Sequence, residues 1–355
     1  MVSHQYHPPF WLKNGLSITL YSALWGRQSW EQTLDLGGAN LKPSYEEVVM
    51  MGAGNVPLFV WLATPPQPRG TIVATYGITG DLSNQWFLQL LGRKAFAQNY
   101  ALVLFDSRAH GKTATLSRTL SSDGLYDGED FVRLAAEAKA RGFPAPFWFA
   151  GFSLGGQLAL WGAKAVQDAE LLATVGLQPE EIGGVAAICP NLDANRSLTY
   201  LEQHPVGCYI ERAIAASLEQ LVQEIDAAHP GWLDPQTVAR AKTIRGFDQE
   251  LVIGRLGFDR VEDYYDATSP LPFLPHLTVP TLILYAADDP MFDPSLVPDL
   301  QAACADNPAI ALHLTRYGGH VGYLSSKSCQ QQWGDGDLWW AWNRVLEWMA
   351  VEGER

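Results

Sequence analysis

A serine stands between glycines at residues 151–155, which read GFSLG and match the pattern G-x-S-x-G. An apolar run precedes these residues and a helix-like stretch follows them. In that context the pattern is typical of a nucleophile elbow, a strained strand-to-helix turn that lifts a serine hydroxyl above a sheet. Larger side chains at the glycines would collide with the strand and the helix. The pattern predicts Ser153 as a nucleophile and the backbone N–H of Leu154, at a helix N-terminus, as a donor to a developing oxyanion.

A serine nucleophile needs a general base, and five histidines follow Ser153 in the chain. His320 lies in a glycine-rich loop, residues 317–322, that leaves the last predicted strand. Glycines would let this loop fold back over the sheet edge towards the serine. The other four lie in a predicted helical insertion, before a strand or inside a strand (His204, His229, His276 and His313). We therefore predict His320 as the base.

The base needs an orienting carboxylate, and the predicted strand at 281–286 is followed by Ala-Asp-Asp-Pro. A carboxylate just beyond the C-terminal end of a strand can reach an imidazole at the same sheet edge. We predict Asp289 as this acid. Asp288 remains the alternative, and the carboxylate that does not serve is expected to cap the turn. Asp293, before Pro294, is interpreted as a helix N-cap.

A second oxyanion donor is expected from the loop after the predicted strand at 71–76. Gly77 permits a tight turn there, and the N–H of Ile78 is the predicted donor. A further turn, residues 106–111, reads DSRAHG and follows the next strand. Its histidine, His110, precedes Ser153 in the chain, so we interpret this turn as a hydrogen-bonded loop that shapes the pocket.

The elements that would position these residues alternate along the chain from about residue 46. Short runs rich in Val, Ile, Leu and Ala predict an opening strand pair at 45–51 and 57–64 and further strands at 71–76, 101–106, 147–152, 185–189, 281–286 and 309–315. Helices are predicted at about 83–98, 127–141, 154–168, 294–304 and 337–350, with Asp337 starting the last one. This order predicts an α/β fold, a mostly parallel sheet with helices on both faces.

Residues 191–278 interrupt this alternation, because they contain no convincing strand. They hold a long amphipathic pattern at 208–225 and a short helix that starts at Asp234-Pro235. The stretch lies between two predicted sheet strands. We therefore predict a single domain, 1–355, with a helical cap at 191–278 over the C-terminal edge of the sheet. Such a cap would enclose an apolar pocket at the edge where ligands bind.

Composition excludes several classes of function. The net charge is −14 and the pI about 4.9, which disfavours binding to nucleic acid or to anionic membrane surfaces. The four cysteines form no CxxC pair, so neither a zinc site nor a disulfide framework is expected. Their scattered positions favour a reducing, cytoplasmic location. No signal peptide or transmembrane helix is predicted at the N-terminus. No cofactor or metal is expected, and the oligomeric state stays open.

Together the ordered motifs resemble those of the α/β-hydrolase superfamily. The likeness is closest to its YheT-like branch, which includes plant Emb8-like proteins and the mammalian membrane-bound lipid hydrolases. The motifs are PPFWLKN at 8–14, GFSLGG at 151–156, the cap-exit residues between 247 and 270, ADDP at 287–290 and GGHVGY at 318–323. The resemblance implies a capped α/β-hydrolase fold and metal-free hydrolysis of carboxylic esters, often acyl glycerides or medium-chain esters.

The resemblance also implies a triad of Ser153, Asp289 and His320. The chain departs from the family at Tyr76-Gly77, where His-Gly is usual, and at residues 106–112, where the family tends to have Phe-Arg-Gly-Cys-Ser-Gly. The expected activity is cleavage of small esters with an apolar, short- to medium-length acyl chain through an acyl-enzyme. Two alternatives stay open: a thioesterase or acyltransferase that uses the same triad, and a non-catalytic binding module, which Tyr76 favours.

Overall fold

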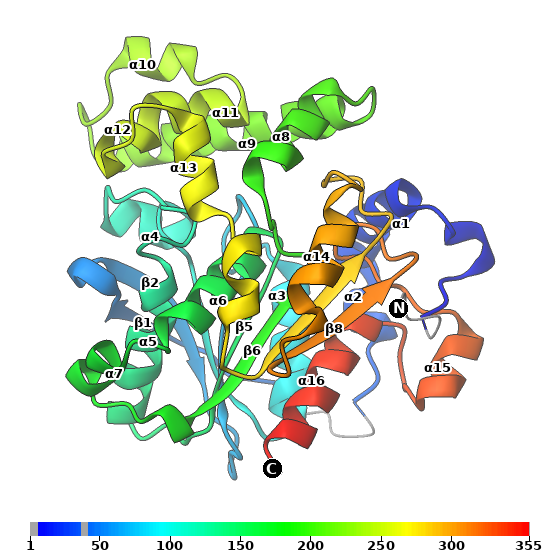
Figure 1. Cartoon of the computed structure of the whole chain (residues 1–355). Helices are drawn as coiled ribbons and strands as arrows, with labels where there is room; N and C mark the ends of the chain where they lie inside the picture. Colours follow the sequence, from blue (N-terminus) through cyan, green and yellow to red (C-terminus); the bar gives the residue numbers. More distant parts are fainter. Residues whose placement is uncertain (1–5, 37–41, 355) are drawn as a thin grey trace.

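The fold is built on one eight-stranded sheet with helices on both faces (Figure 1). The computed structural model describes residues 6–36 and 42–354. In spatial order the strands are β1 (Glu46–Met51), β2 (Pro57–Ala63), β4 (Ala101–Phe105), β3 (Thr71–Thr75), β5 (Phe147–Phe152), β6 (Ile182–Ile188), β7 (Thr281–Ala286) and β8 (Ile310–Thr315). The pairs β1–β2 and β2–β4 are antiparallel, and all the other pairs are parallel. The predicted α/β fold class is confirmed.

Alternate side chains of the central strand β5 show how both faces of the sheet are covered. Phe149 packs against Phe131 of one helix layer, whereas Phe152 packs against Phe87 and Trp342 of the other. The first layer contains α5 (Gly128–Ala140) and α6 (Leu154–Ala165), and the second contains α3 (Trp86–Ala97) and α16 (Trp340–Glu352). Burial on both faces explains why the strands read as continuous apolar runs.

The remaining elements outside the insertion are short. They are η1 (Phe10–Leu12), α1 (Gly15–Tyr21), the π-helical turn η2 (Ser22–Gly26), α2 (Arg27–Thr33), η3 (Ala53–Asn55), α4 (Gly111–Leu116), α7 (Ala169–Val175), η4 (Pro179–Glu181), α14 (Leu296–Ala305) and α15 (Lys327–Trp333). The helices α1 and α2 were not among those predicted, because their sequence lacks a clear apolar period. Among the described residues, every helix is too short or too polar to span a lipid bilayer.

Two predicted helix starts are wrong. The helix α14 begins at Leu296, and the Asp293 carboxylate accepts a hydrogen bond from the N–H of Ser295 in the turn before it. Likewise α16 begins at Trp340, while Asp337 is buried and forms an ion pair with Lys94 of α3. Both aspartates bind nearby N–H groups, but in turns that precede the helices. A local sequence pattern does not distinguish these two uses of an aspartate.

Strand β6 begins three residues before its predicted start, at Ile182 instead of Val185. Two glycines at this point, Gly183 and Gly184, conceal it from a pattern based on apolar side chains. A Cβ atom on Gly183 would lie 2.5 Å from the ring of Trp148 on the neighbouring strand. The glycine therefore makes room for a bulky neighbour within the sheet.

Helices fill the stretch between β6 and β7. They are α8 (Ala194–Gln203), α9 (Gly207–Ala228), α10 (Pro235–Arg240), α11 (Ile244–Phe247), the π-helical turn η5 (Asp248–Val252), α12 (Ile253–Leu256), α13 (Val261–Thr268) and η6 (Leu271–His276). Figure 1 shows α8 to α13 gathered beyond one edge of the sheet. Their apolar side chains form a cluster separate from the main core, with Leu218, Leu221 and Ile225 of α9 packed towards Phe247 and Tyr265.

Candidate active site

Ser153 occupies a strained turn between the end of β5 and the start of α6. Its backbone has φ 55° and ψ −125°, a conformation that L-residues rarely adopt. The glycines around it are required by close backbone contacts. A Cβ atom on Gly151 would lie 2.1 Å from the carbonyl oxygen of Gly155, and one on Gly155 would lie 2.3 Å from that of Tyr76. The sequence pattern thus corresponds to a tight strand–turn–helix crossing that exposes the serine to the sheet edge.

The imidazole of His320 lies against this serine. His320 Nε2 is 2.9 Å from Ser153 Oγ, although 167 residues separate the two in the chain. The loop that carries His320 leaves β8, and its residues Gly318, Gly319 and Val321 all have positive φ values. The ring also packs edge-on against Phe292, with 5.4 Å between the ring centroids.

The N-terminal helix α1 holds the histidine loop in place. The backbone N–H of His320 donates a hydrogen bond to Thr19 Oγ1 over 2.8 Å, and the Thr19 hydroxyl donates to the carbonyl of Gly15. A Cβ atom on Gly319 would lie 2.4 Å from the same Gly15 carbonyl oxygen. The role of Thr19 was not predicted from the sequence, because a contact over 301 residues leaves no local pattern.

The two neighbouring aspartates after β7 make different contacts. Asp289 is 5% exposed, and its Oδ2 atom lies 2.9 Å from His320 Nδ1 while its Oδ1 atom accepts a bond from the N–H of Met291. Asp288 Oδ1 instead accepts a hydrogen bond from the N–H of Gly319 over 2.9 Å. Burial raises the pKa of Asp288 to about 6. The structure therefore brings Asp289 to the imidazole and Asp288 to the backbone of the histidine loop.

Cys189, at the end of β6, is a buried neighbour of this group that the sequence analysis did not single out. Its Sγ atom lies 3.6 Å from the Tyr323 hydroxyl, and ligand atoms of Cys189, Asp289 and His320 lie within 4.8 Å of one another. Burial and the charge of Asp289 raise the pKa of the Cys189 thiol well above its usual value. The raised pKa keeps the thiol protonated, and the side chain packs beside Tyr323 behind the imidazole.

The two residues predicted as oxyanion donors, Leu154 and Ile78, lie close to the serine. Leu154 is the first residue of α6, and the N–H groups of a first helical turn have no acceptor within their own helix. Gly77 lies directly against the serine, because a Cβ atom on it would come within 3.0 Å of Ser153 Cβ. The next residue, Ile78, lines the same cavities as Ser153.

Tyr76 is fully buried, and its side chain is bound to Asp106, the residue after β4. Its hydroxyl donates a 2.6 Å hydrogen bond to Asp106 Oδ1. The Asp106 carboxylate also accepts bonds from the N–H groups of Leu82 and Lys112. Burial raises the pKa of Asp106 to about 6. The side chain of Tyr76 thus holds the start of the loop that carries Ile78.

The turn at 106–111 is a hydrogen-bonded loop. Arg108 forms buried ion pairs with Asp127 and Asp130, and its carbonyl oxygen lies 2.8 Å from His110 Nδ1. The histidines not chosen as the base are held elsewhere: His204 and His229 end α8 and α9, His276 ends η6, and His313 lies in β8 beside Trp340.

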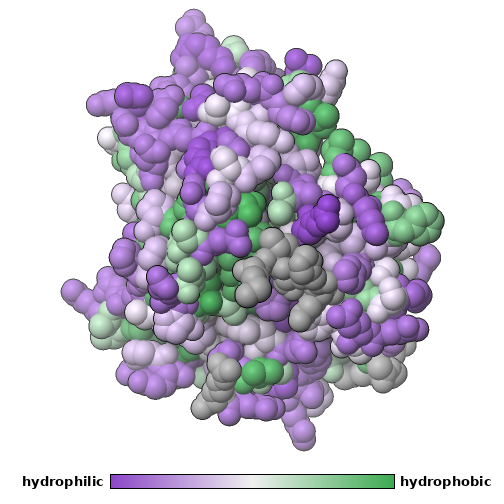
Figure 2. All heavy atoms as spheres, turned by 45° about the vertical axis from the view of Figure 1, so that its right-hand side comes forward, coloured by the Kyte–Doolittle hydropathy of each residue, from purple (hydrophilic) through white to green (hydrophobic). Residues whose placement is uncertain are grey.

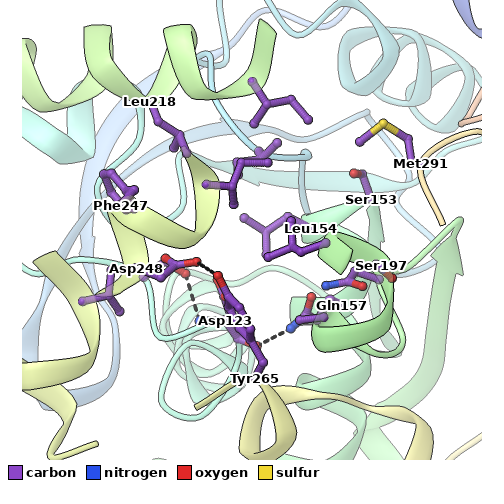
Figure 3. Close-up of a pocket in the computed structure, with 18 of the residues that line it drawn as sticks. Asp123, Ser153, Leu154, Gln157, Ser197, Leu218, Phe247, Asp248, Tyr265 and Met291 are labelled. Atoms are coloured by element: carbon purple, nitrogen blue, oxygen red, sulfur yellow. Dashed lines mark hydrogen bonds between the residues drawn. The ribbon is translucent and has the colours of Figure 1, made fainter. Parts of the chain in front are cut away.

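Two cavities meet at Ser153. The first, which we call the cap cavity, holds about 910 Å³ of empty space including its mouth, and side chains of α6, α8, α9 and α11 line it (Figure 3). The second, the open cavity, holds about 1580 Å³ including its mouth and lies between α1, α3 and α9. Four residues line both cavities: Ile78, Ser153, Ile214 and Met291. A molecule bound at the serine could therefore extend in two directions.

Comparison with known proteins relates the chain to hydrolases. The family model described as "Alpha/beta hydrolase family" matches residues 77–328. A Synechocystis protein named "Putative esterase slr0264" is 50% identical, over 97% of this chain and 94% of its own. "Phospholipase ABHD3" of Homo sapiens is 28% identical over 72% of this chain and 59% of its own, and "Putative esterase YheT" of Escherichia coli is 26% identical over 82% and 80%.

Proposed function

The chain belongs to the alpha/beta hydrolase family, in the branch of the YheT and ABHD3 proteins, and is an ester hydrolase; we propose that Ser153, His320 and Asp289 carry out the hydrolysis. The observation that carries the proposal is the continuous pair of 2.9 Å contacts from Ser153 Oγ through the imidazole to Asp289. A hydroxyl, an imidazole and a buried carboxylate in this order form the arrangement that activates a serine.

In the first half of the reaction, His320 Nε2 takes the hydroxyl proton of Ser153 while Ser153 Oγ attacks the ester carbonyl. The resulting oxyanion accepts hydrogen bonds from the N–H groups of Leu154 and Ile78. Each such donor typically contributes on the order of 3 kcal/mol to transition-state stabilisation. His320 then gives its proton to the leaving alcohol, and an acyl group remains on Ser153.

In the second half, His320 takes a proton from water as the water attacks the acyl-enzyme. His320 then gives this proton to Ser153 Oγ as the acid is released. Asp289 accepts a hydrogen bond from the Nδ1–H group of His320 in both halves of the reaction. It thereby holds the tautomer that leaves Nε2 free to act as a base, and it stabilises the imidazolium that forms twice per cycle. The Asp289 side chain is held for this role by the N–H of Met291.

We propose that the substrate is a small carboxylic ester with apolar groups on both sides of the scissile bond. The acyl part would be short to medium in length. Support comes from the two cavities that meet at Ser153, both lined largely by apolar side chains of the helices above the sheet. The name of the relative ABHD3, a phospholipase, agrees with a lipid-like ester. In this proposal residues 191–278 act as a cap that encloses one arm of the substrate.

The proposal is tested with p-nitrophenyl esters and a fluorophosphonate probe. We expect Ser153→Ala to lower kcat for p-nitrophenyl butyrate by at least about 10⁴-fold and to abolish labelling by the probe, because the nucleophile is lost. Ser328→Ala is the matched control and should retain both activity and labelling, because Ser328 is exposed on α15 and absent from the walls of both cavities. Equal rates for the wild type and Ser153→Ala would refute the proposed nucleophile.

A further inference from the structure

The cap cavity has a polar end that hydrolysis of a plain alkyl ester does not require. Figure 3 shows Asp123, Asp248 and Tyr265 grouped across Leu154 from Ser153, with Gln157 beside them. All of these residues line the cavity together with His110. We call His110, Asp123, Gln157 and Asp248 the acceptor cluster, because the side chain of each has an atom that can accept a hydrogen bond.

Gln157 lies one turn after Ser153 on α6 and is completely buried. Its amide nitrogen donates to the carbonyl oxygens of Asp123, over 2.9 Å, and Thr268, over 3.2 Å. These two acceptors fix the orientation of the amide and use both of its N–H bonds. Its oxygen, Oε1, receives no hydrogen bond from any residue in the described part of the chain. Gln157 therefore contributes a buried acceptor without a protein partner to the wall of the cavity.

His110 presents a second acceptor of this kind. Its Nδ1 atom lies 2.8 Å from the carbonyl oxygen of Arg108, which can only accept, so the ring proton is on Nδ1. Burial lowers the pKa of His110, which keeps the ring neutral and leaves a lone pair on Nε2. The ring is 3% exposed, and within residues 6–36 and 42–354 no donor reaches Nε2.

The carboxyl groups of Asp123 and Asp248 complete the cluster. Asp248 is 8% exposed and accepts a 2.5 Å hydrogen bond from the Tyr265 hydroxyl, which leaves lone pairs free on the carboxyl group. Burial raises the pKa of both aspartates, and the charge of Asp123 raises that of Asp248 further. A buried acceptor without a donor costs free energy. Gln157 Oε1 and His110 Nε2 are two such acceptors at the end of one cavity, so they favour a ligand that carries a donor.

We propose that the cap cavity binds a part of the substrate that ends in a hydrogen-bond donor, a hydroxyl or an ammonium group, beyond a short apolar chain. This inference rests on the proposed ester hydrolysis and defines its substrate class: esters whose cap-side arm is apolar near the carbonyl and polar at its far end. The apolar lining near Ser153, which includes Leu154, Leu218 and Ile214, contacts the chain. The acceptor cluster binds the terminal donor.

Matched pairs of esters test this inference on the wild-type protein. One series places the end group on the acyl side, as p-nitrophenyl esters of alkanoic, ω-hydroxyalkanoic and ω-aminoalkanoic acids of four to ten carbons. A second series places it on the alcohol side, as butyrates of alkanols, diols and amino alcohols. In one of the series we expect kcat/KM to be at least tenfold higher for a donor end than for the methyl-ended ester of equal length.

The acceptor cluster is tested with Asp123→Asn and Asp248→Asn, which replace one acceptor oxygen with an amide donor and keep the side-chain shape. The measurement is the ratio of kcat/KM for donor-ended and methyl-ended esters, which cancels differences in the folded fraction. We expect each variant to lower this ratio about tenfold. Asp263→Asn is the matched control, because Asp263 is exposed on α13 and absent from the cavity wall, and it should keep the wild-type ratio.

The outcomes separate this inference from the proposed function. Ser153-dependent hydrolysis with methyl-ended esters equal or better at every length in both series would overturn the inference alone, and would show that the cluster holds only water. If no ester is turned over, the proposed function fails. The inference is then decided by calorimetric binding of the same ester pairs to Ser153→Ala, where equal affinity for donor-ended and methyl-ended esters would overturn it.

Discussion

At the scale of single residues, the site depends on which of two adjacent carboxylates faces the imidazole. Asp289 contacts His320 Nδ1, while Asp288 binds the N–H of Gly319 in the loop that carries the histidine. The Asp289 contact would act on the imidazole that takes part in the reaction. The Asp288 contact would act on the backbone of the loop that holds this imidazole. These contacts give the two aspartates separable effects on catalysis.

We predict that Asp289→Asn lowers kcat for p-nitrophenyl butyrate by about 10⁴-fold, because an amide in this place favours the wrong imidazole tautomer. Asp288→Asn keeps an oxygen that accepts the Gly319 N–H and should cost less than about tenfold. Steady-state kinetics on both variants, with thermal melting to verify folding, provide the comparison. A larger loss from the Asp288 variant would reverse our assignment of the two roles.

At the scale of elements, the turn from β5 to α6 depends on backbone contacts that exclude side chains. Gly155 packs against the carbonyl of Tyr76, so α6 and the end of β3 approach more closely than a Cβ atom would allow. That contact also sets the position of the loop that carries Ile78. The neighbouring Gly156 has more room, since a Cβ atom there would lie 3.3 Å from the nearest atoms.

We predict that Gly155→Ala destabilises the protein by about 1–3 kcal/mol and lowers kcat at least about tenfold, because the new methyl group pushes α6 away from Tyr76. Gly156→Ala is the matched control. Its small overlap is offset by the roughly 1 kcal/mol by which alanine exceeds glycine in helix propensity. Urea unfolding and kcat measured on both variants decide the matter, and equal behaviour of the two would contradict the steric explanation.

At the scale of the whole molecule, segments from both ends of the chain and from its middle converge on Ser153. The helix α1 supports the histidine loop and lines the open cavity, while α9 lies between the two cavities and contributes to both. The face shown in Figure 2 is mainly hydrophilic and carries scattered apolar patches. The arrangement favours a substrate with one arm in each cavity.

We predict that narrowing each cavity changes length preference on one side of the ester only. Leu218 lines the cap cavity and Ala213 lines the open cavity, both from α9. Leu218→Trp should shorten the preferred chain on one side of the bond and Ala213→Trp on the other, because tryptophan fills space that a chain would occupy. The measurement is kcat/KM over acyl-length and alcohol-length series. Shifts on the same side for both variants would exclude the two-arm arrangement.

The sequence by itself determined the fold class and which residue types could form the site. Continuous apolar runs mark strands buried on both faces, and the glycines of the 151–155 motif mark a turn that only small residues permit. Both signals are local, because periodicity and steric exclusion act over a few residues. The same locality explains why the starts of α14 and α16 were misplaced, since an aspartate binds N–H groups in a turn as well as at a helix end.

Only the tertiary structure decided how distant groups meet. The choice between Asp288 and Asp289, the support of His320 by Thr19 and the bond from Tyr76 to Asp106 each join segments that are far apart in the chain. The polar end of the cap cavity is likewise formed by residues that are far apart in the chain. Asp123 and Asp248 come together only when helices pack over the sheet. Contacts of this sort arise from packing in three dimensions, and packing leaves no periodic trace in the sequence.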